Sequence, residues 1–177
     1  IVDRSLRPLF PKNYCYPTQI TIIALSVDGE ADLQILALNA ASAALYTSEI
    51  PLNLPVNGVR IGKIGGELVV NPSLSNMEQS TLDLFVSGVN DDVLMIEMRT
   101  FGGVDVESPS NPLSLVKTLI DDERAKFSAN AMDEVELMQA LELAKTQIAK
   151  KSKIMQELFA PCIKAPVALT QERKSYH

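Results

Sequence analysis

A long amphipathic segment in the last third of the chain is the feature that most constrains the fold. Beginning near Asp133, its apolar residues recur at steps of three and four, at Val135, Met138, Leu141, Ala144, Ile148, Met155 and Leu158. This spacing is typical of one face of an α-helix, and acids near its start with lysines near its end suit the helix dipole. We therefore expect one long C-terminal helix, ended by Pro161.

The residues before this helix carry the signals of several β-strands. Strands are predicted over 19–27, 56–64, 67–70, 81–89 and 93–98, separated by turns at Asp28-Gly29, Gly65-Gly66 and Asn90-Asp91. Asp32 is a candidate N-cap for a buried, Leu- and Ala-rich helix over 33–45. The order of strand, helix, further strands and helix predicts an α+β fold with a mixed sheet packed against helices.

The first eleven residues resemble the last turns of a helix that Pro8 and Pro11 end, and no methionine precedes them. We therefore expect a fragment that lacks the N-terminal part of its first domain. Residues 101–131 are expected to form an irregular insertion with one short helical candidate over 113–126. Residues 132–160 complete the domain with the long helix, and residues 161–177 are expected to be a linker toward further domains.

Composition limits the chemistry that this chain can perform. Its net charge of −6 is not that of a typical nucleic-acid binder, and its one histidine is the last residue, His177. Cys15 and Cys162 lie far apart and match no metal-ligand spacing, so they are expected to be buried or free thiols. No apolar run is long enough to span a membrane, and a cytoplasmic location is expected.

Clustered carboxylates are the only side chains in this sequence that suggest an active site. Asp28, Glu30 and Asp32 fall in one turn, and Asp91 with Asp92 in another. Turn chemistry and helix capping explain these acids better than catalysis does. Gly62 and the Gly65-Gly66 pair could suggest a phosphate loop, but no helix with the required lysine and hydroxyl follows. The residues alone predict no catalytic and no metal-binding side chain.

Several stretches, in this order and at this spacing, resemble a known family. They are I-V-D-R-S-L-R-P-L-F-P (1–11), L-N-A-A-S-A-A-L (38–45), I-P-L-N-L-P-V-N-G-V-R-I-G (50–62), V-V-N-P-S (69–73) and L-D-L-F-V-S-G (82–88). Together they are similar to the first of the two RNase PH-like core domains of the bacterial polynucleotide phosphorylases. The resemblance covers residues 1–100, as the C-terminal portion of that domain, and resumes over the helix from 132 to about 158.

The resemblance implies an RNase PH-like fold and a parent enzyme that is a polyribonucleotide nucleotidyltransferase. Such an enzyme is a homotrimeric ring that degrades RNA from its 3′ end, with inorganic phosphate as nucleophile and nucleoside diphosphates as products. It depends on Mg²⁺. The resemblance also implies an RNA-degradation complex with a ribonuclease or helicase as a candidate partner. The alternative is a non-catalytic RNase PH-like scaffold or RNA-binding subunit of an exosome-like ring.

Matched position by position, the resemblance implies that this portion is catalytically silent. The family's second core domain carries two acids six residues apart and a lysine two residues after the second. Here Asp83 stands at the second acid, but Met77 and Phe85 replace the first acid and the lysine. The phosphate-binding serines of that domain fall at Asp32-Leu33-Gln34, where a carboxylate would repel phosphate. We therefore expect Mg²⁺ to bind outside this chain.

RNA contact is the role that the resemblance leaves to this portion. The family carries an arginine-rich loop just upstream of the position of Ile1, and Arg4 and Arg7 follow it on the same helix. These two arginines are predicted to help line the RNA channel through salt-sensitive backbone contacts. The alternative is that Arg4 or Arg7 forms a buried or inter-subunit ion pair, for instance with Asp3 or an acid elsewhere. Arg60 and Lys63 are expected to be ordinary strand-surface charges.

Overall fold

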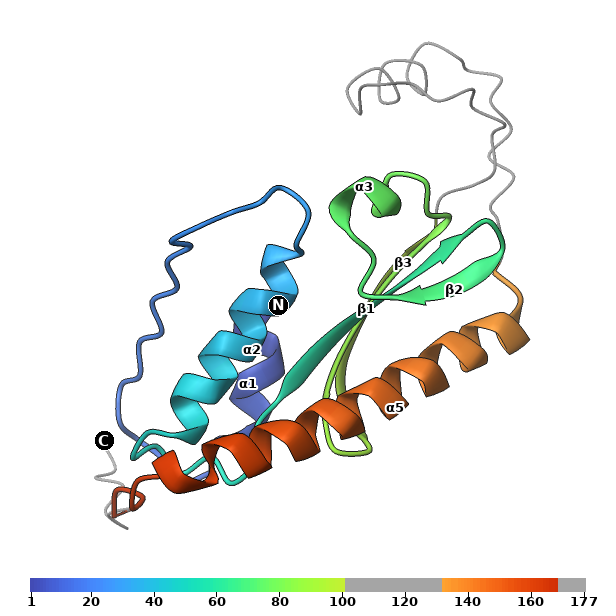
Figure 1. Cartoon of the computed structure of the whole chain (residues 1–177). Coiled ribbons are helices and arrows are strands. Elements are labelled where there is room, and N and C mark those ends of the chain that lie inside the picture. The colour runs from blue at the N-terminus through green and yellow to red at the C-terminus, as the bar shows by residue number, and fades with distance from the viewer. Residues whose placement is uncertain (101–131, 169–177) are drawn as a thin grey trace, which may run out of the picture.

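The computed structural model describes residues 1–100 and 132–168, which form a four-stranded sheet between two helical layers (Figure 1). On one face lie α1 (Val2–Leu6), continued by the short 3₁₀-helix Arg7–Leu9, and α2 (Leu33–Tyr46). On the other face lies the long helix α5 (Glu134–Phe159), followed by the 3₁₀-helix Ala160–Cys162. The α+β prediction and the long C-terminal helix are confirmed. The predicted insertion and its helix over 113–126 lie outside the described residues.

The sheet has the order β2-β1-β3-β4, and each neighbouring pair is antiparallel. Its strands are β1 (Asn57–Ile64), β2 (Glu67–Val70), β3 (Leu82–Val89) and β4 (Asp92–Thr100). For the described part of the chain the predicted mixed sheet is therefore wrong. Tight turns join β1 to β2 and β3 to β4, and strands joined in this way run antiparallel. β1 and β3 are connected through β2 and α3, and they also run antiparallel. Gly65 and Gly66, with φ of 58° and 87°, make the first turn, and the short helix α3 (Leu74–Met77) lies between β2 and β3.

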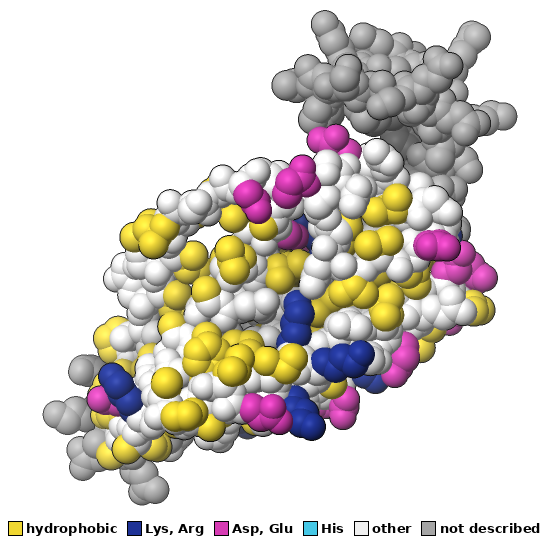
Figure 2. Space-filling view, viewed as in Figure 1, with side chains coloured by type: hydrophobic (Ala, Val, Ile, Leu, Met, Phe, Trp, Pro, Cys, Tyr) yellow, Lys and Arg dark blue, Asp and Glu magenta, His cyan; other side chains and the backbone are white. Residues whose placement is uncertain are grey.

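Each face of the sheet has its own hydrophobic core. Toward α5, the fully buried residues include Val59, Ile61, Leu84 and Val86 of the sheet with Ala140, Ala144 and Ile148 of the helix. Alanine at two of these positions lets the helix backbone approach the sheet closely. Of the predicted apolar stripe, Val135, Met138 and Leu158 are instead 59%, 61% and 67% exposed, and Figure 2 shows hydrophobic side chains on the molecular surface. Toward α1 and α2, the core contains Leu6, Leu38 and Phe85.

Local hydrogen bonds confirm the predicted cap and turn around residue 30. One carboxylate oxygen of Asp32 accepts from the amides of Gln34 and Ile35 at 2.8 and 3.4 Å, which caps α2. Asp28 accepts from the amides of Ala31 and Glu30, both at 2.9 Å, and these bonds lower the pKa of its carboxyl. Asp28 and Asp32 thus bond to the backbone, as turn chemistry predicts, whereas Glu30 accepts from the hydroxyl of Ser75 at 2.7 Å.

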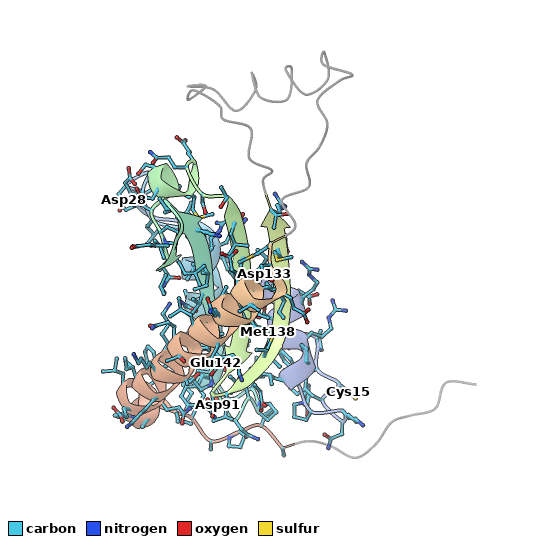
Figure 3. The ribbon with its side chains drawn as sticks, turned by 90° about the vertical axis from the view of Figure 1, so that its right-hand side faces the viewer. Cys15, Asp28, Asp91, Asp133, Met138 and Glu142 are labelled. Carbon is cyan, nitrogen blue, oxygen red and sulfur yellow. The ribbon has the colours of Figure 1, made fainter. Side chains whose placement is uncertain are left out.

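The strand predicted over 19–27 is not formed. In the described part of the chain this segment is extended but pairs with no strand, although its composition is that of a buried one. Ile23 and Leu25 are 72% and 95% exposed. Figure 3 places Cys15 and Asp28 at opposite ends of the molecule, so the segment between them runs along its length. Between this segment and α1 lies a largely apolar groove of about 490 Å³, lined among others by Leu6, Phe10 and Ile20.

Because the backbone amides of residues 19–27 have no hydrogen-bond partner in a neighbouring strand, we expect them to exchange rapidly in the isolated chain. Hydrogen–deuterium exchange read by mass spectrometry should show residues 19–27 exchanging roughly 100-fold or more faster than the central strand β3. Equal protection of the two segments would mean that 19–27 finds a strand partner in solution, for instance in a second copy of the chain. A dilution series distinguishes pairing within the chain from pairing between two copies, since protection by a second copy decreases as the protein is diluted.

Candidate functional site

The register of the sheet brings charged side chains together on the face covered by α1 and α2. Arg60 of β1 lies opposite Phe85 of β3, which in turn lies opposite Glu97 of β4. One step along, Asp83 lies opposite Arg99. Since alternate residues of a strand share a face, these positions share one face with the core residue Met95. α1 adds Arg4, and the N-cap of α2 adds Asp32.

Arg60 is the centre of a largely buried ion-pair network. Its Nε and Nη2 atoms donate to the two carboxylate oxygens of Asp83 at 2.6 and 2.7 Å, a bidentate arrangement. Its Nη1 atom donates to Oδ2 of Asp32 at 2.5 Å, while Oδ1 of the same carboxylate caps α2. The side chains of Arg60, Asp32 and Asp83 are 16%, 7% and 15% exposed. Hydrogen bonding to Asp83 raises the pKa of Arg60 despite its partial burial.

A second, exposed network lies beside the first. Arg4 donates from Nη2 to Glu97 at 2.7 Å, and Arg99 lies 3.6 Å from the other oxygen of the same carboxylate. The arginine side chains are 63% and 69% exposed, whereas Glu97 is 34% exposed. Between the two networks is a hollow of about 50 Å³, lined by Ile1, Gln34, Arg60, Asp83, Phe85, Glu97 and Arg99.

This arrangement does not fit a divalent cation. Both oxygens of Asp83 accept from Arg60, and the other carboxylate within reach, Asp32, is bound to the same guanidinium. A cation would have to displace a positive group that is already paired. Across residues 1–100 and 132–168, no group of three or more His, Cys, Asp or Glu side chains is placed to hold a metal ion.

The arginines predicted to contact RNA are on the surface, and both form ion pairs. Arg7 donates from Nε and Nη2 to the carboxylate of Asp3 one turn earlier, and its side chain is 76% exposed. Arg4 pairs with Glu97. Both arginines thus form ion pairs, but these pairs are exposed and lie within one chain, unlike the buried or inter-subunit pair of the alternative. RNA contact stays a prediction, because exposed pairs exchange readily.

The structure corrects the expectation for Arg60 and adds a partner for Lys63. Arg60 is not a strand-surface charge, because the capping carboxylate of α2 and the neighbouring strand enclose it. Lys63 lies near the surface and pairs with Glu136 of α5 at 2.8 Å. Sequence reasoning missed Glu97 and Arg99. The predicted strand 93–98 stops one residue before Arg99, whereas β4 continues to Thr100 and places the two residues on one face. Cys15 and Cys162 are both free and exposed.

Comparison with known proteins identifies the family of this chain. The model described as "3′ exoribonuclease family, domain 1" matches residues 1–51, and the model for domain 2 of the same family matches residues 55–108. The chain belongs to the 3′ exoribonuclease family. The two matched regions meet between α2 and β1, so the Arg60–Asp32 and Arg4–Glu97 ion pairs each join one region to the other.

Curated relatives agree with this membership. The chain is 54% identical over 171 residues to a polyribonucleotide nucleotidyltransferase of Wolinella succinogenes, and 50% identical over 161 residues to one of Sulfurimonas denitrificans. These alignments cover 96% and 90% of this chain but 23% and 22% of the relatives. The chain thus spans about a quarter of their length.

A solved structure supports the fold. The crystal structure of rice Rrp46 superposes with a TM-score of 0.53 at 15% identity, covering 76% of this chain and 51% of the rice chain. The RNase PH-like fold is therefore confirmed. None of the helices that the structure describes combines the length and the apolar character needed to cross a membrane.

Proposed function

We propose that this chain is part of a phosphorolytic 3′-to-5′ exoribonuclease, a polyribonucleotide nucleotidyltransferase. The observation that carries the proposal is the 54% identity, over 96% of the chain, to a relative of that name. The parent enzyme degrades RNA with inorganic phosphate, releases nucleoside diphosphates and requires Mg²⁺. It acts in the cytoplasm as a homotrimeric ring, and a ribonuclease or helicase of an RNA-degradation complex is its candidate partner.

Within that enzyme, we propose that residues 1–100 and 132–160 are catalytically silent. The support is the bidentate bond of Arg60 to Asp83, since Asp83 is the one carboxylate at a position matching a catalytic acid of the related domain. A carboxylate whose two oxygens both accept from a fixed guanidinium is not available to bind Mg²⁺. Catalysis and Mg²⁺ binding then belong to other parts of the parent.

The role that remains for this portion is ring assembly and guidance of RNA. Arg4 and Arg7 are exposed on α1 and present guanidiniums suited to phosphate oxygens. We propose that they contact the RNA backbone as it enters the channel. Such contacts position RNA without reading its sequence.

The test is phosphate-dependent release of ADP from poly(A) in the presence of Mg²⁺, by the full-length protein and by the 177-residue chain. We expect release by the full-length protein alone, and loss of that release when EDTA removes the metal or phosphate is omitted. Full-length protein carrying Asp83→Asn should retain activity, since Asn still accepts from Arg60.

Other outcomes are equally informative. Activity of the short chain, abolished by Asp83→Asn, would contradict the silent assignment. Inactivity of both proteins, with folding verified by circular dichroism, would favour the non-catalytic scaffold of an exosome-like ring.

A further inference from the structure

Lys151 of α5 lies at an open stretch of the edge of strand β1. In the described part of the chain, β2 pairs only with Ile61–Ile64 of β1, so the edge of β1 before these residues has no strand beside it. There, Asn39 of α2 accepts from the amide of Gly58 at 2.9 Å, and Nζ of Lys151 donates to the carbonyl oxygen of Gly58 at 3.2 Å. Two side chains thus satisfy the backbone groups that a neighbouring strand would otherwise bind.

Lys151 has no counterion among the described residues. The lysine ion pairs within residues 1–100 and 132–168 are those of Lys63 and Lys145, and Arg60, the other cation of β1, is also paired. α2, whose Asn39 bonds to the same glycine, contains no charged residue over its whole length. On α5, the positions three and four residues away, which are the neighbours of a side chain on a helix, are all uncharged: Gln147, Ile148, Ile154 and Met155.

Partial burial without a counterion favours the neutral amine at this position. Lys151 is half-buried, and desolvation lowers the pKa of its ammonium group from the ordinary value. A neutral amine keeps N–H donors, so the bond to the Gly58 carbonyl does not require a charge, while the lone pair of the nitrogen makes it a nucleophile. Lys150 and Lys153 of the same helix are exposed instead. Packing thus gives one lysine of this group an environment that the others lack.

We propose that Lys151 is a modification site that accepts an acyl group from an acyl phosphate. The nitrogen of the neutral amine attacks the carbonyl carbon, the N–C bond forms, and the C–O bond to the phosphate breaks. Inorganic phosphate leaves with the bonding electron pair, and the amine proton passes to solvent. The amide product keeps one N–H for the Gly58 carbonyl, so acylation removes the charge without removing this contact. The site is separate from the RNA role proposed above and does not depend on it.

The experiment uses the full-length protein and acetyl phosphate as the probe, at a conversion so low that most molecules are acetylated no more than once. Cleavage after Glu142 and Glu157 releases one peptide whose fragment ions locate each acetyl group on its four lysines, Lys145, Lys150, Lys151 and Lys153. Near neutral pH, Lys151 should carry about threefold or more acetyl than Lys153. The excess should shrink toward about pH 10, where lysine amines in general become neutral.

Two variants of α5 test the missing counterion. Gln147→Glu places a carboxylate one turn before Lys151, where an (i, i+4) pair favours the ammonium form, and should remove most of the excess. Thr146→Glu is the matched control, because it adds the same charge one position earlier, opposite Lys150. It should leave the ratio of acetyl on Lys151 to acetyl on Lys153 within about 1.5-fold of that in the unsubstituted protein.

Three outcomes would overturn this inference. Acetylation of Lys151 equal to or below that of Lys153 overturns the site, because packing then shields the amine more than it activates it. An excess that persists in urea-unfolded protein also overturns it, since the cause would be local sequence rather than packing against β1. An unchanged ratio in Gln147→Glu overturns the missing counterion as the cause. None of these measurements uses RNA, so they stand whether or not the full-length protein releases ADP from poly(A).

Discussion

Replacing Arg60 with alanine is expected to lower the free energy of unfolding of the chain by about 3 kcal/mol. The substitution removes the partner of two carboxylates that are only 7% and 15% exposed, and leaves Asp32 and Asp83 facing each other without a cation. Like charges held together in a partly desolvated site repel, and each has lost its strongest hydrogen bonds. Urea unfolding followed by far-UV circular dichroism measures the effect.

Two further variants show whether the cause is unpaired charge. Arg99→Ala, which removes a 69% exposed arginine of the same face, should change the free energy of unfolding by no more than about 0.5 kcal/mol. The triple variant Asp32→Asn, Arg60→Ala, Asp83→Asn should recover part of the loss, because asparagine still caps α2 and carries no charge. If Arg60→Ala unfolds at the same urea concentration as Arg99→Ala, the network contributes nothing to stability.

Gly88→Ala is expected to destabilise the chain by about 3 kcal/mol, through backbone crowding rather than charge. A Cβ atom at this position would lie 2.3 Å from the backbone oxygen of Asp92 in the adjoining strand. The β3–β4 pairing shifts register between Ser87 and Gly88, and this irregularity brings the two backbones together. The hairpin would have to open to admit a methyl group, and the same urea titration reports the loss.

Gly62→Ala is the matched control for Gly88→Ala. Its added Cβ would approach the side-chain atoms of Ser80, Met77 and Pro72 at 3.0 to 3.1 Å rather than a strand backbone. Side-chain ends can move by a few tenths of an ångström, so the loss should be clearly smaller. Equal losses for the two variants would show that the close approach at Gly88 does not decide the stability of the hairpin.

The ion pairs of the charged face also hold the two family regions together. Arg60 and Glu97 belong to the region that matches domain 2, while their partners Asp32 and Arg4 belong to the region that matches domain 1. The Arg60–Asp32 ion pair is thus a structural contact between the two regions.

The elements read correctly from the sequence are those whose signals are local. The period of α5, the cap at Asp32 and the Gly65-Gly66 turn each depend on residues within a few positions, and backbone sterics and hydrogen bonding act over that range. The resemblance to the RNase PH-like family could also be detected from the sequence, since it rests on the order and spacing of short motifs. These features predicted the fold class, the capping role of Asp32 and the position of Asp83 on a strand.

Tertiary structure alone decided the outcome for residues 19–27 and for Arg60. A strand exists only where a second strand supplies hydrogen-bond partners, so a β-rich composition cannot by itself decide whether 19–27 is paired. The environment of Arg60 depends on Asp83 and Asp32, 23 and 28 positions away, which meet only once β3 and the first turn of α2 pack beside β1. Local sequence therefore determined most elements of this protein, whereas their packing determined which charged side chains are enclosed and which stay exposed.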